Sequence, residues 1–313
     1  MANHAAEDGD NIVFIYTGGD QVVPHDVIHI LIDESVTDIP DRCFFGRRLL
    51  ETIECHDNVR KIGRNAFTHC HSLRWVKLPG VVDIGILAFA NCINLEYIEF
   101  GNKLVIIRED AFRWCTSLRH VVLPSIQEIR SHAFMKCTRL SDVELLSDEL
   151  GTIGRYTFAE CPALRSISIP LKDGIIVGNS EFGWSNNLTS VNLIGEIHQS
   201  ISCLHLKSWR NDMYEEINRI NQVLSTTSAY ANDKTDAIRE WIHSVIRNME
   251  HYKVEHSNLL MEAATLLELD LWSIKLDNER VDEGDVHRRA QCRVNCGSNI
   301  IIRNVLDFLK MPP

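Results

Sequence analysis

The stretch that decides the fold reads Ala111-Phe112-Arg-Trp-Cys115-Thr-Ser-Leu118-Arg-His-Val121-Val-Leu123-Pro124. Phe112, Cys115 and Leu118 stand three residues apart, which is helical spacing. From Val121 onward, apolar residues recur at every second position, which is the period of a strand. The stretch therefore predicts a short helical turn followed by a strand whose alternate side chains point into a core.

The same series returns along the chain, and its phenylalanine is the best marker of each copy. The seven copies are marked by Phe44, Phe67, Phe89, Phe112, Phe134, Phe158 and Phe182. These markers are 23, 22, 23, 22, 24 and 24 residues apart, and only the first and last copies lack the Cys, carrying Arg47 and Ser185 instead. A unit this small cannot bury its apolar stripe alone, so copies in phase predict stacked coils with a parallel sheet and one continuous core.

These copies resemble the BspA-type leucine-rich repeats, whose pattern is Ile-x-x-x-Ala-Phe-x-x-Cys-x-x-Leu-x-x-Ile-x-Leu-Pro. The resemblance covers about residues 27–195. It implies a solenoid that is used for protein–protein contact. Some bacterial and protist relatives are cell-surface adhesins, a role that needs a secretion signal.

We predict an α+β fold, a leucine-rich-repeat solenoid with a parallel sheet and short helical turns followed by an all-α C-terminal module. Residues 1–10 are expected to be disordered, and residues 11–35, which match only the strand part of the pattern, to form an N-terminal cap. The solenoid of about seven repeats is expected over residues 36–197, and the helical module over residues 198–313.

The helical module has two interpretations. Apolar residues recur at steps of three and four over residues 206–224 and again from Ile238. A bundle that covers the last coil is favoured, because an open parallel edge invites aggregation. The alternative is a pair of helices for dimerisation or effector binding, with Trp241 and Trp272 as anchors.

Half of the ten cysteines belong to the repeat: Cys70, Cys92, Cys115, Cys137 and Cys161. We expect a buried ladder of free thiols, because cysteine packs as a small apolar residue and a reducing compartment disfavours disulfides. Cys292 and Cys296 lack a second pair of ligands, so no metal site is predicted there. No cofactor is expected either.

Composition and motifs narrow the class of function. The net charge is −11, which disfavours binding to nucleic acid, and the basic run Arg288, Arg289 and Arg293 fits a solvated helix face. No signal peptide or membrane-spanning run is recognisable, so we expect a soluble cytoplasmic protein with no membrane partner. Phosphate-loop, nucleophile-elbow, dinucleotide and zinc-protease motifs are missing, so no catalytic residues are predicted.

The predicted binding surface is the exposed face of the sheet. Side chains eight and ten residues past each phenylalanine should point away from the core, and we select these for partner binding: Trp75, Lys77, Tyr97, Glu99, His120, Asp142 and Glu144. The three rings should form an aromatic column that anchors a partner, with the carboxylates selecting basic side chains. The alternative is that the aromatic residues only stabilise one another across strands.

The sequence therefore predicts a non-enzymatic scaffold or adaptor that binds a protein. One alternative is a surface-displayed recognition protein that is exported without a signal peptide. The other is an enzyme in the helical module, which would need clustered carboxylates or histidines in a pocket there. The identity of the partner and the oligomeric state, including a helix-mediated dimer, stay open.

Overall fold

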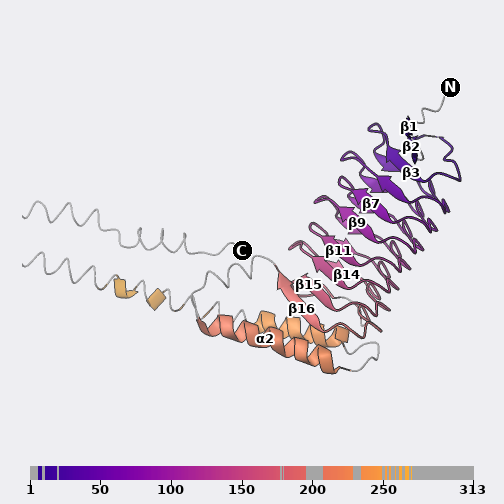
Figure 1. Cartoon of the computed structure of the whole chain (residues 1–313). Coiled ribbons are helices and arrows are strands. Elements are labelled where there is room, and N and C mark those ends of the chain that lie inside the picture. The colour runs from indigo at the N-terminus through magenta and orange to yellow at the C-terminus, as the bar shows by residue number, and fades with distance from the viewer. Residues whose placement is uncertain are drawn as a thin grey trace, which may run out of the picture. The chain divides into compact units, whose positions relative to one another are not determined.

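The computed structural model describes residues 6–8, 11–19, 21–176, 178, 180–194, 207–227 and 234–248, with separate helical residues between 251 and 269. The chain divides into two compact units, Met1–Ile246 and Arg247–Pro313, and the repeats lie in the first. Its coils stack in sequence order from the N-terminal strands to β16, and helix α2 lies beside the last coil (Figure 1).

One face of each coil contributes a strand to what we call the front face. Its first ladder is six-stranded, in the order β1-β2-β3-β5-β7-β9, and its second runs β11-β13-β15-β16. These strands are β1 (Ala6–Asp8), β2 (Asn11–Tyr16), β3 (His29–Ile32), β5 (Thr52–Glu54), β7 (Trp75–Leu78), β9 (Tyr97–Phe100), β11 (His120–Leu123), β13 (Asp142–Leu145), β15 (Ser166–Pro170) and β16 (Ser190–Ile194). The predicted parallel solenoid is therefore confirmed.

A second sheet, which the sequence analysis missed, lies on another side of the coils. Its strands are β4 (Asp38–Ile39), β6 (Lys61–Ile62), β8 (Asp83–Ile84), β10 (Ile106–Ile107), β12 (Glu128–Ile129) and β14 (Thr152–Ile153), all parallel. In each of them the second residue is an isoleucine and is buried, whereas the residue before it faces outward. A strand of two residues is too short to show an alternation of apolar and polar residues. The sequence pattern therefore revealed that the isoleucine points inward, but not that it belongs to a strand.

The segments around the phenylalanines are turns without an α-helix, so the predicted short helical turns are wrong. The amide of Phe67 donates to the Ala88 carbonyl of the next coil at 2.7 Å, whereas the amide of Cys70 donates back to the Phe67 carbonyl at 3.2 Å. Asn65 (φ 53°) and His69 (φ 64°) adopt left-handed conformations on either side of Phe67. Because alternate amides bond to the next coil, they are not available for the local bonds of a helix.

The phenylalanines form one buried column. Neighbouring rings from Phe44 to Phe182 lie nearly parallel, with centroids 4.9–5.9 Å apart. Tyr16 closes the N-terminal end of the column, with its ring edge-on to Phe44 at 5.2 Å. The phenylalanines of the seven copies are therefore aligned in one column, as stacked repeats require.

The five repeat cysteines are buried and free. Each thiol donates to the phenylalanine carbonyl of the preceding coil, as Cys115 Sγ does to Phe89 O at 3.2 Å. At the same position of the last copy, Ser185 Oγ donates to Phe158 O at 2.6 Å. The position therefore takes a small side chain that is apolar enough to be buried and still satisfies a buried carbonyl.

The N-terminal end departs from the prediction in residues 6–8. Residues 6–8, expected to be disordered, form strand β1, which pairs antiparallel with β2. Strand β2 in turn runs parallel to β3, so the segment predicted as a cap extends the front sheet. Without β1, strand β2 would present an unpaired sheet edge, and antiparallel pairing needs only a tight turn.

Two helical segments of the first unit cover the C-terminal coil: α2 (Lys207–Thr226) and residues 234–246. Thr235 Oγ1 accepts a hydrogen bond from the Phe182 amide at 3.2 Å, and Asn221 Oδ1 accepts one from the Val191 amide at 3.0 Å. Trp241 is buried and donates Nε1–H to Glu216 O at 3.1 Å, which joins the two segments. Burial rules Trp241 out as an exposed dimer anchor, while Trp272 lies outside the described residues.

Lys234 also binds the last coil. Its side chain is buried, burial lowers its pKa, and Nζ donates to the carbonyls of Asn186 (2.7 Å) and Leu188 (2.6 Å). Lys234→Ala should lower the free energy of unfolding by about 2–3 kcal/mol, because two carbonyls lose their donor. Guanidinium-induced unfolding measures the change, with the exposed Lys172→Ala as a matched control. Equal losses in the two variants would contradict this role.

Candidate binding surfaces

The strand register brings four of the predicted site residues together on the front face. Trp75 and Lys77 of β7 lie directly beside Tyr97 and Glu99 of β9. Tyr97 is 57% exposed, and Trp75 is half-buried. This group lies on the open side of the sheet because its residues alternate with the buried Val76 and the half-buried Ile98.

The other three predicted residues lie on the second ladder. Among the described strands, β9 and β11 are not paired, and the register resumes with His120 beside Asp142. Within the described chain no ring contact joins Tyr97 to Trp75 or to His120. The predicted aromatic column is therefore interrupted: Trp75 and Tyr97 are neighbours on the first ladder without stacking, and His120 lies on the second.

Charges on the front face are partly paired already. Lys77 Nζ lies 3.0 Å from Glu54 Oε1, and the hydrogen bond to that carboxylate raises the pKa of Lys77. His120 Nε2 lies 3.2 Å from Glu144 Oε1. Glu99, in contrast, is exposed, and its carboxylate makes no hydrogen bond or ion pair with another described side chain. Glu99 is thus the carboxylate of this face best placed for a cation from outside.

Two apolar side chains that the sequence analysis did not select extend this face. Ile15 of β2 and Leu31 of β3 are 39% and 43% exposed. They continue the row of Glu54, Lys77 and Glu99, because β2, β3, β5, β7 and β9 share one register. Carrying the alternation of the repeats upstream into residues 11–35 would have found them.

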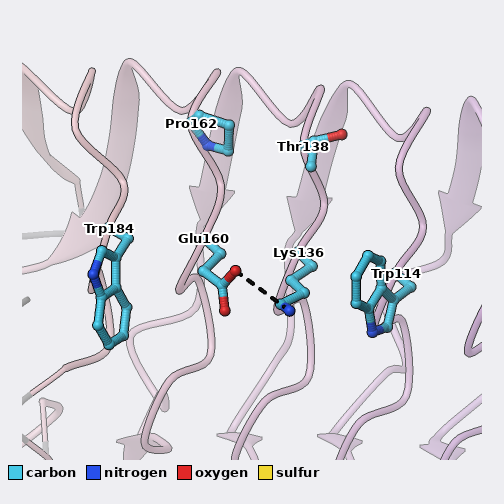
Figure 2. A pocket seen from close by; sticks show the side chains of 6 residues that line it. All are labelled: Trp114, Lys136, Thr138, Glu160, Pro162 and Trp184. Atoms are coloured by element: carbon cyan, nitrogen blue, oxygen red, sulfur yellow. Dashed lines mark ion pairs between the residues drawn. The ribbon is translucent and has the colours of Figure 1, made fainter.

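A second surface lies along the turns and was also missed. The residues two positions past the phenylalanine adopt left-handed conformations in successive coils, and four of them form a row: Trp114, Lys136, Glu160 and Trp184 (Figure 2). Together with Thr138 and Pro162 they line a groove of about 500 Å³. The spacing of three predicted a helical turn at these positions, which hid the fact that they line up from coil to coil.

The described residues contain no candidate metal centre. Nowhere among them do three His, Cys, Asp or Glu side chains come together in a way that would hold a metal ion. Of the helices in the described part of the chain, none is both long and apolar enough to cross a membrane. The alternative of an enzyme in the helical module concerns residues 198–313, and most of these lie outside the described part of the chain.

Stacked coils with a parallel front sheet, a buried phenylalanine column and outward rows of side chains define a leucine-rich-repeat solenoid. The sequence model of the BspA-type leucine-rich repeat region matches residues 26–139 and 82–202, with six copies, which is more than half of the chain. The chain belongs to the BspA-type leucine-rich-repeat family, and the resemblance seen in the sequence is confirmed.

Solved structures give further similarities. A T. pallidum leucine-rich-repeat protein is 24% identical, with 63% of this chain and 90% of that chain covered and a TM-score of 0.43. A leucine-rich-repeat protein from Bacteroides ovatus is 23% identical, with 54% and 56% covered and a TM-score of 0.38. A leucine-rich cell surface protein from Faecalibacterium prausnitzii is 20% identical, with 54% and 61% covered and a TM-score of 0.35. No curated protein matches the chain.

Proposed function

We propose that this chain is a non-enzymatic, cytoplasmic scaffold or adaptor that binds a segment of a protein partner on its front face. The observation that carries the proposal is the pair Trp75 and Tyr97, which lie side by side on a flat, open sheet. Large rigid rings bury much area at little entropic cost, and such rings dominate the energetics of protein interfaces.

The charges of this face favour a basic partner. Glu99 lies next to Lys77 on the first ladder, and Asp142 and Glu144 follow on the second. The net charge of −11 adds a long-range attraction for cationic segments. The aromatic pair supports affinity in this proposal, whereas the carboxylates support selection of the partner and a fast encounter.

Replacing both rings tests the proposal. Partners are captured with the wild-type chain, identified by mass spectrometry, produced in pure form and titrated by calorimetry. Trp75→Ala/Tyr97→Ala should weaken binding at least tenfold, because truncating two central aromatic residues costs ~1–2 kcal/mol each. The matched control is Ser166→Ala/Asn192→Ala on the same face, which should bind like the wild type. Unchanged affinity of the aromatic variant, with an unchanged melting curve, would reject the front face as the binding site.

A further inference from the structure

The groove along the turns contains a cation site that the chain fills itself. Lys136 Nζ lies 4.3 Å from the centre of the Trp114 ring and 3.4 Å from Glu160 Oε2. An ammonium group over an indole face and beside a carboxylate is attracted by both. At this end of the row, a tryptophan ring and a carboxylate together hold a cation.

The other end of the row has the same groups without the cation. Trp184 follows Glu160 in the next coil, and its side chain is 49% exposed (Figure 2). Among the described residues no cation lies over the Trp184 ring, and no hydrogen bond reaches Glu160 Oε1. An indole and a carboxylate oxygen without a hydrogen-bond partner among the described residues therefore line this end of the groove.

We propose that the Trp184–Glu160 end of the groove binds an arginine side chain of a polypeptide partner. The guanidinium stacks on the Trp184 ring and donates to Glu160 Oε1, so it uses the same two kinds of group that Lys136 contacts, here on adjacent coils. Arginine fits better than lysine because its planar group stacks on an aromatic face and is more weakly hydrated. Pro162, which lines the same groove, offers an apolar surface to the aliphatic stem.

This site is independent of the proposed front-face function. Trp184 and Glu160 project from the turns, two residues past their phenylalanines, whereas Trp75 and Tyr97 project from the front sheet. Each site therefore has variants that leave the other unchanged. Failure of one proposal does not imply failure of the other.

The probe is a blocked glycine-rich peptide with a single arginine, and its control is the same peptide with citrulline, the uncharged isostere. The indole N–H resonances of the six tryptophans report binding in nuclear magnetic resonance titrations, and Trp184→Phe identifies the Trp184 signal. We expect a saturable shift of that signal with the arginine peptide and at least tenfold weaker binding of the citrulline peptide. Equal binding of both peptides overturns the proposal.

Variants of the chain separate the two contacts. Glu160→Gln should weaken the arginine peptide about tenfold, because the charge that pairs with the guanidinium is removed. Lys136→Met should strengthen binding a few-fold, because the Glu160 carboxylate then no longer pairs with the Lys136 ammonium group and is left for the peptide. Trp75→Ala, on the front face, should bind like the wild type. Glu160→Gln with unchanged affinity and an unchanged melting curve refutes the site.

Discussion

Phe112→Ala is expected to lower the free energy of unfolding by about 4 kcal/mol, as large truncations in well-packed cores do. Phe112 is fully buried, and its ring is stacked between Phe89 and Phe134 with centroids 5.1 Å away on both sides. Backbone hydrogen bonds tie its turn to the next coil, so the walls of the cavity cannot collapse easily. Each coil is stabilised by its neighbours, so the loss at a central coil affects both halves of the solenoid.

The measurement is chemical unfolding of the whole chain, followed by circular dichroism. Trp114→Ala is the matched control, since this large ring lies in the same turn but is 38% exposed, and it should cost less than 1 kcal/mol. A similar loss in the two variants would mean that the phenylalanine column does not dominate the core.

Alkaline pH should destabilise the fold by a comparable or larger amount. Burial raises the pKa of the Cys70 and Cys161 thiols to about 12, and that of Cys92, Cys115 and Cys137 well above the ordinary 9.0. The folded chain thus holds these protons more tightly than the unfolded chain does. The stabilisation is complete below pH 9 and is lost as the pH rises from 9 toward 12, by up to ~1.4 kcal/mol per pH unit for each thiol.

Burial also raises the pKa of the Cys55 thiol to about 12. With these six thiols, chemical unfolding at pH 8, 9 and 10 should show a loss of several kcal/mol over this range. Cys115→Ser removes one titrating group while keeping a donor for the Phe89 carbonyl, just as Ser185 donates to the Phe158 carbonyl. The slope of stability against pH should fall by about a sixth in this variant. Equal stability at pH 8 and 10, or an unchanged slope in the variant, would show that the thiols do not control it.

The repeat could be read from the chain because its signal is local and is repeated many times. Phe112, Cys115 and Leu118 have the same relation to the core in every copy, so seven copies fixed which side chains point inward. The turn conformation could not be read in this way. A spacing of three fits a helix and also the observed turn, and the two differ in whether the Phe112 amide bonds locally or to Ala133 in the next coil.

The front-face residues were found for the same reason as the core. Once Val76 and Leu78 are assigned inward, Trp75 and Lys77 must face outward. The interruption after Tyr97 carries no signal in the pattern, since the copy around Phe112 is as regular as its neighbours. The row from Trp114 to Trp184 is equally invisible, because left-handed backbone at non-glycine residues is not encoded by periodicity.

The amino-acid order alone thus determined the repeat length, the inward set and the outward row of the sheet, because each follows from one residue and its near neighbours. The three-dimensional structure decided the division of the sheet, the second strand of each coil, the groove between Trp114 and Trp184, and the contacts of Lys234 with the last coil. Those features depend on hydrogen bonds and contacts between residues that are about 20 or more positions apart. No local pattern records such partners, so only the folded chain reveals them.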